Sequence, residues 1–93
     1  MNIDETLNER GTRYGEFADN ADVSQKLKQT LHASKNWKDL PNYMKEALEM
    51  TMHKISRLLN GDFTYTDNVV DILGYNRLML DDMNRENAKT KVD

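Results

Sequence analysis

The spacing of the apolar residues is the feature that most limits how this chain can fold. Apolar side chains recur every three or four residues along most of the sequence, as they do on one face of an α-helix. A β-strand needs apolar and polar residues to alternate over about four to eight positions, and no segment has that pattern. The sequence therefore predicts an all-α protein.

Four helices are expected, with capping residues, glycine and proline setting their limits. The expected ranges are residues 2–10, 21–33, 41–59 and 67–84. Gly11 is expected to end the first helix, so that residues 11–20 form a loop carrying Arg13, Tyr14 and Phe17. Gly61 is expected to end the third helix as a left-handed cap.

The length of 93 residues suits one domain, and the short connections between the helices predict a compact antiparallel bundle. We expect residues 1–85 to form a single helical domain and residues 86–93 to form a frayed tail. The core is expected from apolar stripes on three helices: Val23, Leu27, Thr30 and Leu31; Met44, Ala47, Leu48, Met52, Ile55, Leu58 and Leu59; and Val69, Ile72, Leu73, Tyr75, Met79 and Leu80.

A second apolar stripe on the fourth helix predicts self-association. Val70, Gly74 and Leu78 lie four residues apart, away from the main stripe, and the glycine permits close approach. We expect another helix to pack there, so that the chain forms a homo-oligomer, a dimer joined through its third and fourth helices. The alternative interpretation is a poorly buried leucine.

Composition narrows the range of functions. The chain has 13 Lys and Arg against 16 Asp and Glu, a net charge of -3, which gives no electrostatic reason to bind nucleic acid or an anionic membrane. No apolar run approaches the length of about 20 residues that spans a bilayer, and the N-terminal residues do not resemble a signal peptide. Cysteine is absent, which excludes disulfides and thiolate chemistry. We expect a cytoplasmic protein without a membrane partner.

Polar residues form a candidate site on the third and fourth helices. A ridge of acidic and then basic residues, three or four apart, follows the third helix opposite its apolar stripe. From the spacing alone, a solvated helix face is the simpler explanation of such a ridge. If the polar sides of the two helices converge, their carboxylates can hold Mg²⁺, which prefers oxygen ligands. The candidate metal ligands are Glu46, Glu49, Asp67 and Asp71.

Cationic and aromatic residues near these acids suit a phosphate-bearing ligand such as a nucleotide. Arginine contacts phosphate oxygens in a bidentate manner, and an aromatic ring can stack on a base. The candidate ligand-binding residues are Arg13, Tyr14, His53, Lys54, Arg57 and Tyr75. The simpler interpretations are a hydrogen-bonded surface histidine and tyrosines that fill the core.

Several of these residues stand in motifs that resemble a known family. The motifs are Glu9-Arg10-Gly11, Arg13-Tyr14-Gly15, Phe17, Trp37, Glu46-Ala47-Leu48-Glu49-Met50, His53-Lys54-Ile55, Arg57, Asn60-Gly61-Asp62, Asp71 and Gly74-Tyr75. Together they resemble a small domain of unknown function found in bacteriophage and prophage genomes, over about residues 5–80. That family is distantly similar to all-α nucleoside triphosphate pyrophosphohydrolases of MazG type.

The resemblance implies a magnesium site made by a Glu-x-x-Glu on one helix and a Glu-x-x-Asp on the next. Glu46 and Glu49 match the first half. In the second half Asp71 matches, but Asn68 stands where the family has its first carboxylate, and Asp67 is one position out of register. The resemblance therefore implies binding of a nucleotide, with Mg²⁺ as a possible companion, more directly than it implies pyrophosphohydrolase activity.

Two hypotheses of different classes follow. The first is a phage-encoded helical protein that binds a nucleotide or another phosphate ligand in an acidic groove between the third and fourth helices, with or without Mg²⁺. The second is a non-enzymatic phage protein that binds and inhibits a host enzyme or defence complex, because an acidic surface can occupy a site meant for nucleic acid.

Overall fold

The structure is a computed structural model that describes residues 2–90, the side chain of Thr90 excepted. Four α-helices and one short 3₁₀ helix follow one another: α1 (Ile3–Tyr14), α2 (Phe17–His32), η1 (Trp37–Asp39), α3 (Asn42–Asn60) and α4 (Asp67–Thr90). The described part of the chain contains no strand. The prediction of an all-α protein with four helices is confirmed.

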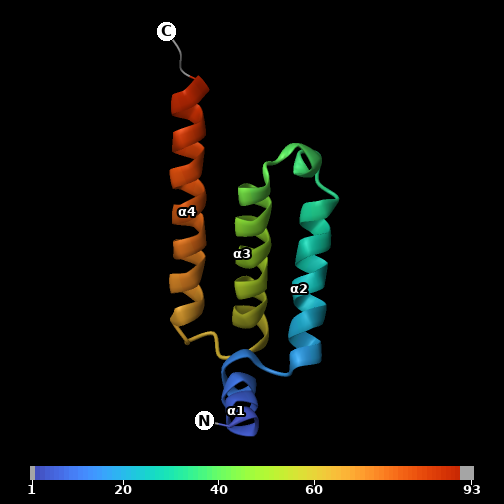
Figure 1. Ribbon diagram of the computed structural model, residues 1–93. Helices are drawn as coiled ribbons and strands as arrows, with labels where there is room; N and C mark the ends of the chain where they lie inside the picture. Colours follow the sequence, from blue (N-terminus) through green and yellow to red (C-terminus); the bar gives the residue numbers. More distant parts are fainter. Residues whose placement is uncertain (1, 91–93) are drawn as a thin grey trace.

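Three of the helices lie side by side. Figure 1 shows α3 in the middle, with α2 along one flank and α4 along the other, and neighbouring helices run in opposite directions. α1 lies at the end of this row, beneath the C-terminal end of α3 and the start of α2. The predicted helical bundle is present, but it is not compact: α2 and α4 lie on opposite flanks of α3, so the long helices form an open layer without a closed central core.

The dimensions agree with an open layer. The chain measures 57 × 28 × 23 Å, and its radius of gyration is 16.2 Å. A compact domain of this length has a radius of gyration of about 12 Å. Part of the excess comes from α4, which at about 1.5 Å per residue is roughly 36 Å long and extends past the N-terminal end of α3 (Figure 1).

The prediction of a loop at residues 11–20 is wrong, because Gly15 ends α1, and not Gly11. Gly11 lies within the helix, where one glycine costs only about 1 kcal/mol. Gly15 has a φ of 82°, which glycine adopts without strain, and its N–H donates to the carbonyl of Gly11. The chain then enters α2 after a single further residue, so Arg13 and Tyr14 belong to the last turn of α1.

Two glycines allow the end of α1 to cross the end of α3 at close range. A Cβ on Gly61 would overlap the backbone of Arg13 and Tyr14, and one on Gly15 would overlap the carbonyl of Asn60. The N–H of Asp62 donates to the carbonyl of Arg13 at 2.8 Å. Gly61 has a φ of -118°, so the expected left-handed cap is wrong. Position 61 therefore needs glycine because the two backbones approach closely there, and not because of a positive φ.

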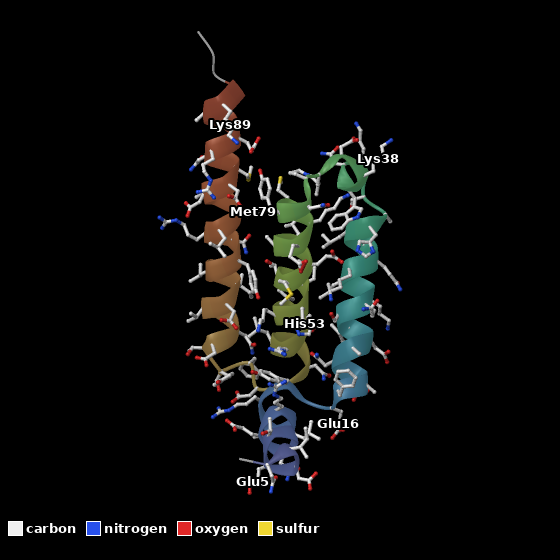
Figure 2. All side chains as sticks on the ribbon, viewed as in Figure 1. Glu5, Glu16, Lys38, His53, Met79 and Lys89 are labelled. Carbon is white, nitrogen blue, oxygen red and sulfur yellow. The ribbon has the colours of Figure 1, made fainter. Side chains whose placement is uncertain are left out.

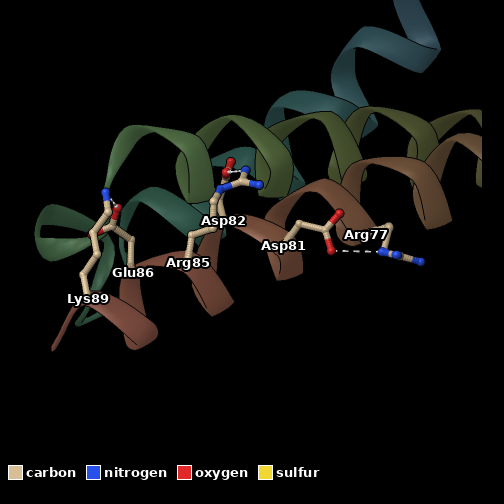
Figure 3. A network of polar contacts seen from close by, with 6 residues as sticks. All are labelled: Arg77, Asp81, Asp82, Arg85, Glu86 and Lys89. Atoms are coloured by element: carbon tan, nitrogen blue, oxygen red, sulfur yellow. Dashed lines mark hydrogen bonds and ion pairs between the residues drawn. The ribbon is translucent and has the colours of Figure 1, made fainter. Parts of the chain in front are cut away.

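α3 begins and ends within one residue of the expected range, whereas α4 continues to Thr90. Ion pairs between residues three or four apart follow its C-terminal half: Arg77 with Asp81, Asp82 with Arg85, and Glu86 with Lys89 (Figure 3). Such pairs each stabilise a helix by a few tenths of a kcal/mol. They help to keep residues 85–90 helical. Residues 91–93 of the expected tail lie outside the described residues.

The seams of the layer are lined by small and polar side chains. Ala47 is the only buried apolar residue among those described, whereas Asn20, Ser24, Thr51, Ser56 and Asn68 are buried polar residues. The hydroxyl of Ser56 donates to the Asn20 side chain across the α2–α3 seam, at 3.0 Å. Small residues let the helices approach closely, but they bury little apolar surface.

Several predicted core residues are exposed in this chain. Leu59, Val69, Leu73 and Leu80 are 67%, 45%, 66% and 51% exposed. The reason is geometrical: in a layer, a helix is covered on its flanks only, so a side chain on either broad face stays open to solvent. No helix in residues 2–90 is long and apolar enough to cross a membrane.

Candidate functional site

The structure assigns the predicted acidic residues to separate partners. Glu49 contacts His32 of α2, with 3.1 Å between Oε2 and Nε2. Asp71 of α4 pairs with Lys54 of α3 at 2.9 Å. Asp67 accepts a hydrogen bond from the Tyr65 hydroxyl at 2.7 Å, which raises the pKa of that tyrosine.

These contacts place the acids on different flanks of α3. Glu49 faces α2, whereas Lys54, which holds Asp71, lies about 140° further around the helix and faces α4. Glu46 is exposed. Within residues 2–90, no group of three or more His, Asp or Glu side chains is arranged to hold a metal ion. Glu49 and Asp71, two of the four predicted ligands, thus lie at different flanks of α3.

A group of cations gathers in the C-terminal half of α3, where Figure 2 shows His53. The pKa of His53 is lowered, first by burial and then by the charges of Arg57, Lys28 and Lys54. Among residues 2–90, no carboxylate opposes this shift. Lys54 is neutralised by Asp71, but neither Lys28 nor Arg57 forms an ion pair within the described residues. Two uncompensated cations thus lie near a neutral histidine, and together we call Lys28, His53 and Arg57 the cationic cluster.

Aromatic rings hold the arginines at this end of the molecule. The guanidinium carbon of Arg57 lies 3.9 Å from the centre of the Tyr14 ring, and that of Arg13 lies 4.3 Å from the centre of the Tyr65 ring. The two rings contact each other at a tilted angle, with their centres 6.3 Å apart. Cation–π contacts of this kind are worth about 0.5–1 kcal/mol at exposed sites and more when desolvated. Tyr14 therefore fixes the guanidinium of Arg57 rather than presenting a free face.

One donor in the cationic cluster has no acceptor. The Nε of Arg57 is buried and makes no hydrogen bond to any described residue. A buried donor without a partner costs about 1–3 kcal/mol. The end of α1 positions this group, since Asn60 of α3 donates to the carbonyls of Tyr14 and Glu16 at 3.4 and 3.3 Å. The Gly15–Gly61 crossing thus brings α1, α2 and α3 together around Arg57.

The predicted ligand-binding residues divide into two sets. Arg13, Tyr14 and Arg57 come together where α1 crosses the end of α3, and His53 lies one turn before Arg57, beside Lys54 in its pair with Asp71. Tyr75 does not join them: it lies on α4 and lines a shallow groove of about 440 Å³ together with Val70, Asp71, Gly74 and Leu78.

Two members of this region were missed from the sequence, Lys28 and Tyr65. A weak signal for Lys28 exists, because it stands three residues before Leu31 and so lies at the edge of the apolar stripe of its helix. A lysine at that edge is half-buried, as Lys28 is. Tyr65 lies in the turn before α4, and the sequence holds no signal that this turn meets α1.

No protein-family model, no curated protein and no solved structure matches this chain. The resemblance to the phage domain and to the MazG-type enzymes therefore stays a prediction.

Proposed function

We propose that this protein binds a phosphate-bearing small molecule, of the nucleotide class, through the cationic cluster of Lys28, His53 and Arg57. The observation that carries the proposal is the uncompensated positive charge of Lys28 and Arg57 in a chain whose net charge is -3. Lys28 and Arg57 are half-buried beside His53, so water screens their charges less than those of the exposed lysines, and an anion that binds there is attracted more strongly.

The chemistry of each group suits a phosphate. Arg57 offers planar donors that match phosphate oxygens, and its buried Nε lacks an acceptor. Tyr14 covers one side of the guanidinium and limits its motion. Lys28 adds a mobile point charge from the neighbouring helix. His53, neutral in the free protein because its pKa is lowered, gains a proton when an anion approaches.

The proposal concerns binding without a metal ion. Two of the predicted magnesium ligands, Glu49 and Asp71, pair with basic side chains on opposite flanks of α3, so no step is assigned to Mg²⁺. Turnover is not proposed either, because no carboxylate orients His53 as a base.

The second hypothesis, an inhibitor of a host protein, stays a prediction. Exposed apolar side chains on α4 are compatible with a protein partner. They carry no chemistry that identifies one, so the proposal is limited to the phosphate ligand.

Isothermal titration of the full chain with inorganic phosphate, AMP, ADP, ATP and adenosine tests the proposal. We expect heat of binding with the phosphates and none with adenosine. Arg57→Gln and Lys28→Gln should each weaken binding by about tenfold to a hundredfold, the effect of losing one hydrogen bond to a charged group. Lys26→Gln is the matched control, because Lys26 is an exposed lysine of the same helix.

Two results would overturn the proposal. The first is the absence of binding to every phosphate at millimolar concentration. The second is an equal loss of affinity in Lys26→Gln and Lys28→Gln, since that result would indicate attraction by overall charge and not by a site.

A further inference from the structure

One broad face of the helical layer carries a set of large apolar side chains. We define the α3–α4 apolar face as Leu48, Ile55 and Leu59 of α3 with Val69, Leu73 and Leu80 of α4. Leu48 and Ile55 are half-buried, and the other four are between 45% and 67% exposed.

Contacts across the α3–α4 seam place these six residues on the same side of the layer. The amide of Asn76 donates to the hydroxyl of Thr51 at 3.0 Å. Helical spacing puts Leu48, Ile55 and Leu59 next to Thr51, at three residues before it and at four and eight after it. Val69, Leu73 and Leu80 adjoin Asn76 in the same way, at seven and three residues before it and four after it. The Asn76–Thr51 contact therefore joins the two stripes.

The ion pair between Lys54 and Asp71 marks the opposite side of this seam. Lys54 is three residues after Thr51, whereas Leu48 is three residues before it, so the two lie on either side of Thr51 around the helix. The polar candidate site and the α3–α4 apolar face thus occupy opposite faces of the layer, and a partner on one leaves the other open.

The stripe on α4 has the spacing of a helix-packing seam. Val69, Leu73 and Leu80 recur at intervals of four and seven residues, beside Asn76, which contacts α3. None of them is charged, although α4 contains eight charged residues. A surface without charge can meet an identical copy of itself without electrostatic repulsion. A surface with a net negative charge, such as the whole chain has, would repel its copy.

The exposed area also corresponds to a missing subunit. A folded monomer of 10.9 kDa exposes about 5,600 Å², whereas this chain exposes 6,943 Å². The excess of about 1,300 Å², to which the protruding end of α4 contributes, is large enough to include the roughly 1,000 Å² that each subunit of an obligate homodimer buries.

We propose that a second copy of this chain packs on the α3–α4 apolar face, related to the first by a two-fold axis. The two layers then enclose one core between them, built from α3 and α4 of both subunits. Every molecule of this chain is synthesised together with others of the same kind, so a second copy is always present as a partner. The single layer needs a partner because Ala47 is its only buried apolar residue among those described. This interface differs from the stripe of Val70, Gly74 and Leu78 that the sequence indicated.

The absence of cysteine permits a direct test with matched single-cysteine variants. Leu73 and Leu78 are 66% and 63% exposed in the single chain, so Leu73→Cys and Leu78→Cys would react with a thiol reagent at equal rates in a monomer. In the proposed dimer only position 73 is covered, and we expect it to react about tenfold more slowly or less. Leu80→Cys and Val70→Cys, at 51% and 60% exposure, form a second pair in case one variant fails to fold.

Light scattering on the unmodified chain and on each variant accompanies the rate measurement. We expect twice the mass of 10.9 kDa and a melting temperature that rises with protein concentration. A monomeric mass at about 100 µM with equal rates would overturn the proposal and leave the face to a different protein. A dimer that protects positions 70 and 78 instead of 73 and 80 would overturn it in favour of the other stripe.

Discussion

Substitution of Gly61 by alanine tests the crossing that builds the candidate site. The added Cβ would overlap the backbone of Arg13 and Tyr14, which has no rotamer into which to withdraw. The end of α1 must therefore move away from α3. Gly74 is the matched control: it lies within α4, and a Cβ there would meet nothing within 4 Å.

The contacts that the movement breaks set the size of the effect. They are the hydrogen bond from Asp62 to Arg13 at 2.8 Å and the two weaker bonds from Asn60 to the carbonyls of Tyr14 and Glu16. At about 1 kcal/mol for each good hydrogen bond, we expect Gly61→Ala to cost about 1–3 kcal/mol. Gly74→Ala should add about 0.8–1 kcal/mol, the difference in helix propensity between the two residues.

Thermal unfolding followed by circular dichroism measures both variants. For a domain of this size 1 kcal/mol corresponds to about 4–8 °C, so the melting temperature should fall by about 5–20 °C in Gly61→Ala and rise by several degrees in Gly74→Ala. Phosphate affinity should also fall in Gly61→Ala, because Tyr14 leaves Arg57. Equal stability of Gly61→Ala and the unmodified chain would refute the close crossing of α1 and α3.

Two further predictions concern pH and metal ions. The pKa of His53 is lowered in the folded chain, so the unfolded chain binds a proton that the folded chain does not. The free energy of unfolding should therefore decline as the pH falls below 6.5. Urea titrations should find a smaller decline in His53→Gln than in the unmodified chain. Phosphate should offset part of that decline in the unmodified chain. Removal of divalent ions with EDTA should leave the phosphate affinity in isothermal titration unchanged, whereas a loss of binding would restore the magnesium hypothesis.

The helices were predictable because their signals are local. The three-to-four residue spacing and the proline before α3 determined that helix to within a residue. The end of α1 was predicted four residues early, since a glycine inside a helix and a glycine that ends one look alike in sequence. The difference is the conformation of Gly15, which depends on its contact with Asn60 of a distant helix.

The candidate site was predictable in part. Arg57 and His53 stand one turn apart on α3, so their proximity follows from helical spacing alone. Their association with Tyr14 depends on where α1 docks. The carboxylates of Glu49 and Asp71 have different neighbours from those expected, because α3 lies between α2 and α4. A sequence pattern places residues on a helix face, but it does not say which neighbouring helix that face will meet.

The sequence by itself determined that this chain is helical, where most of its helices lie and which faces of them are apolar, because these properties depend on residues within a few positions of one another. Only the tertiary structure decided that the helices form an open layer, that the acids separate and that uncompensated cations gather beside Tyr14. These outcomes depend on how far apart the helix axes lie and how they are ordered, and the small residues Ala47, Ser24 and Ser56 set those distances through contacts between helices.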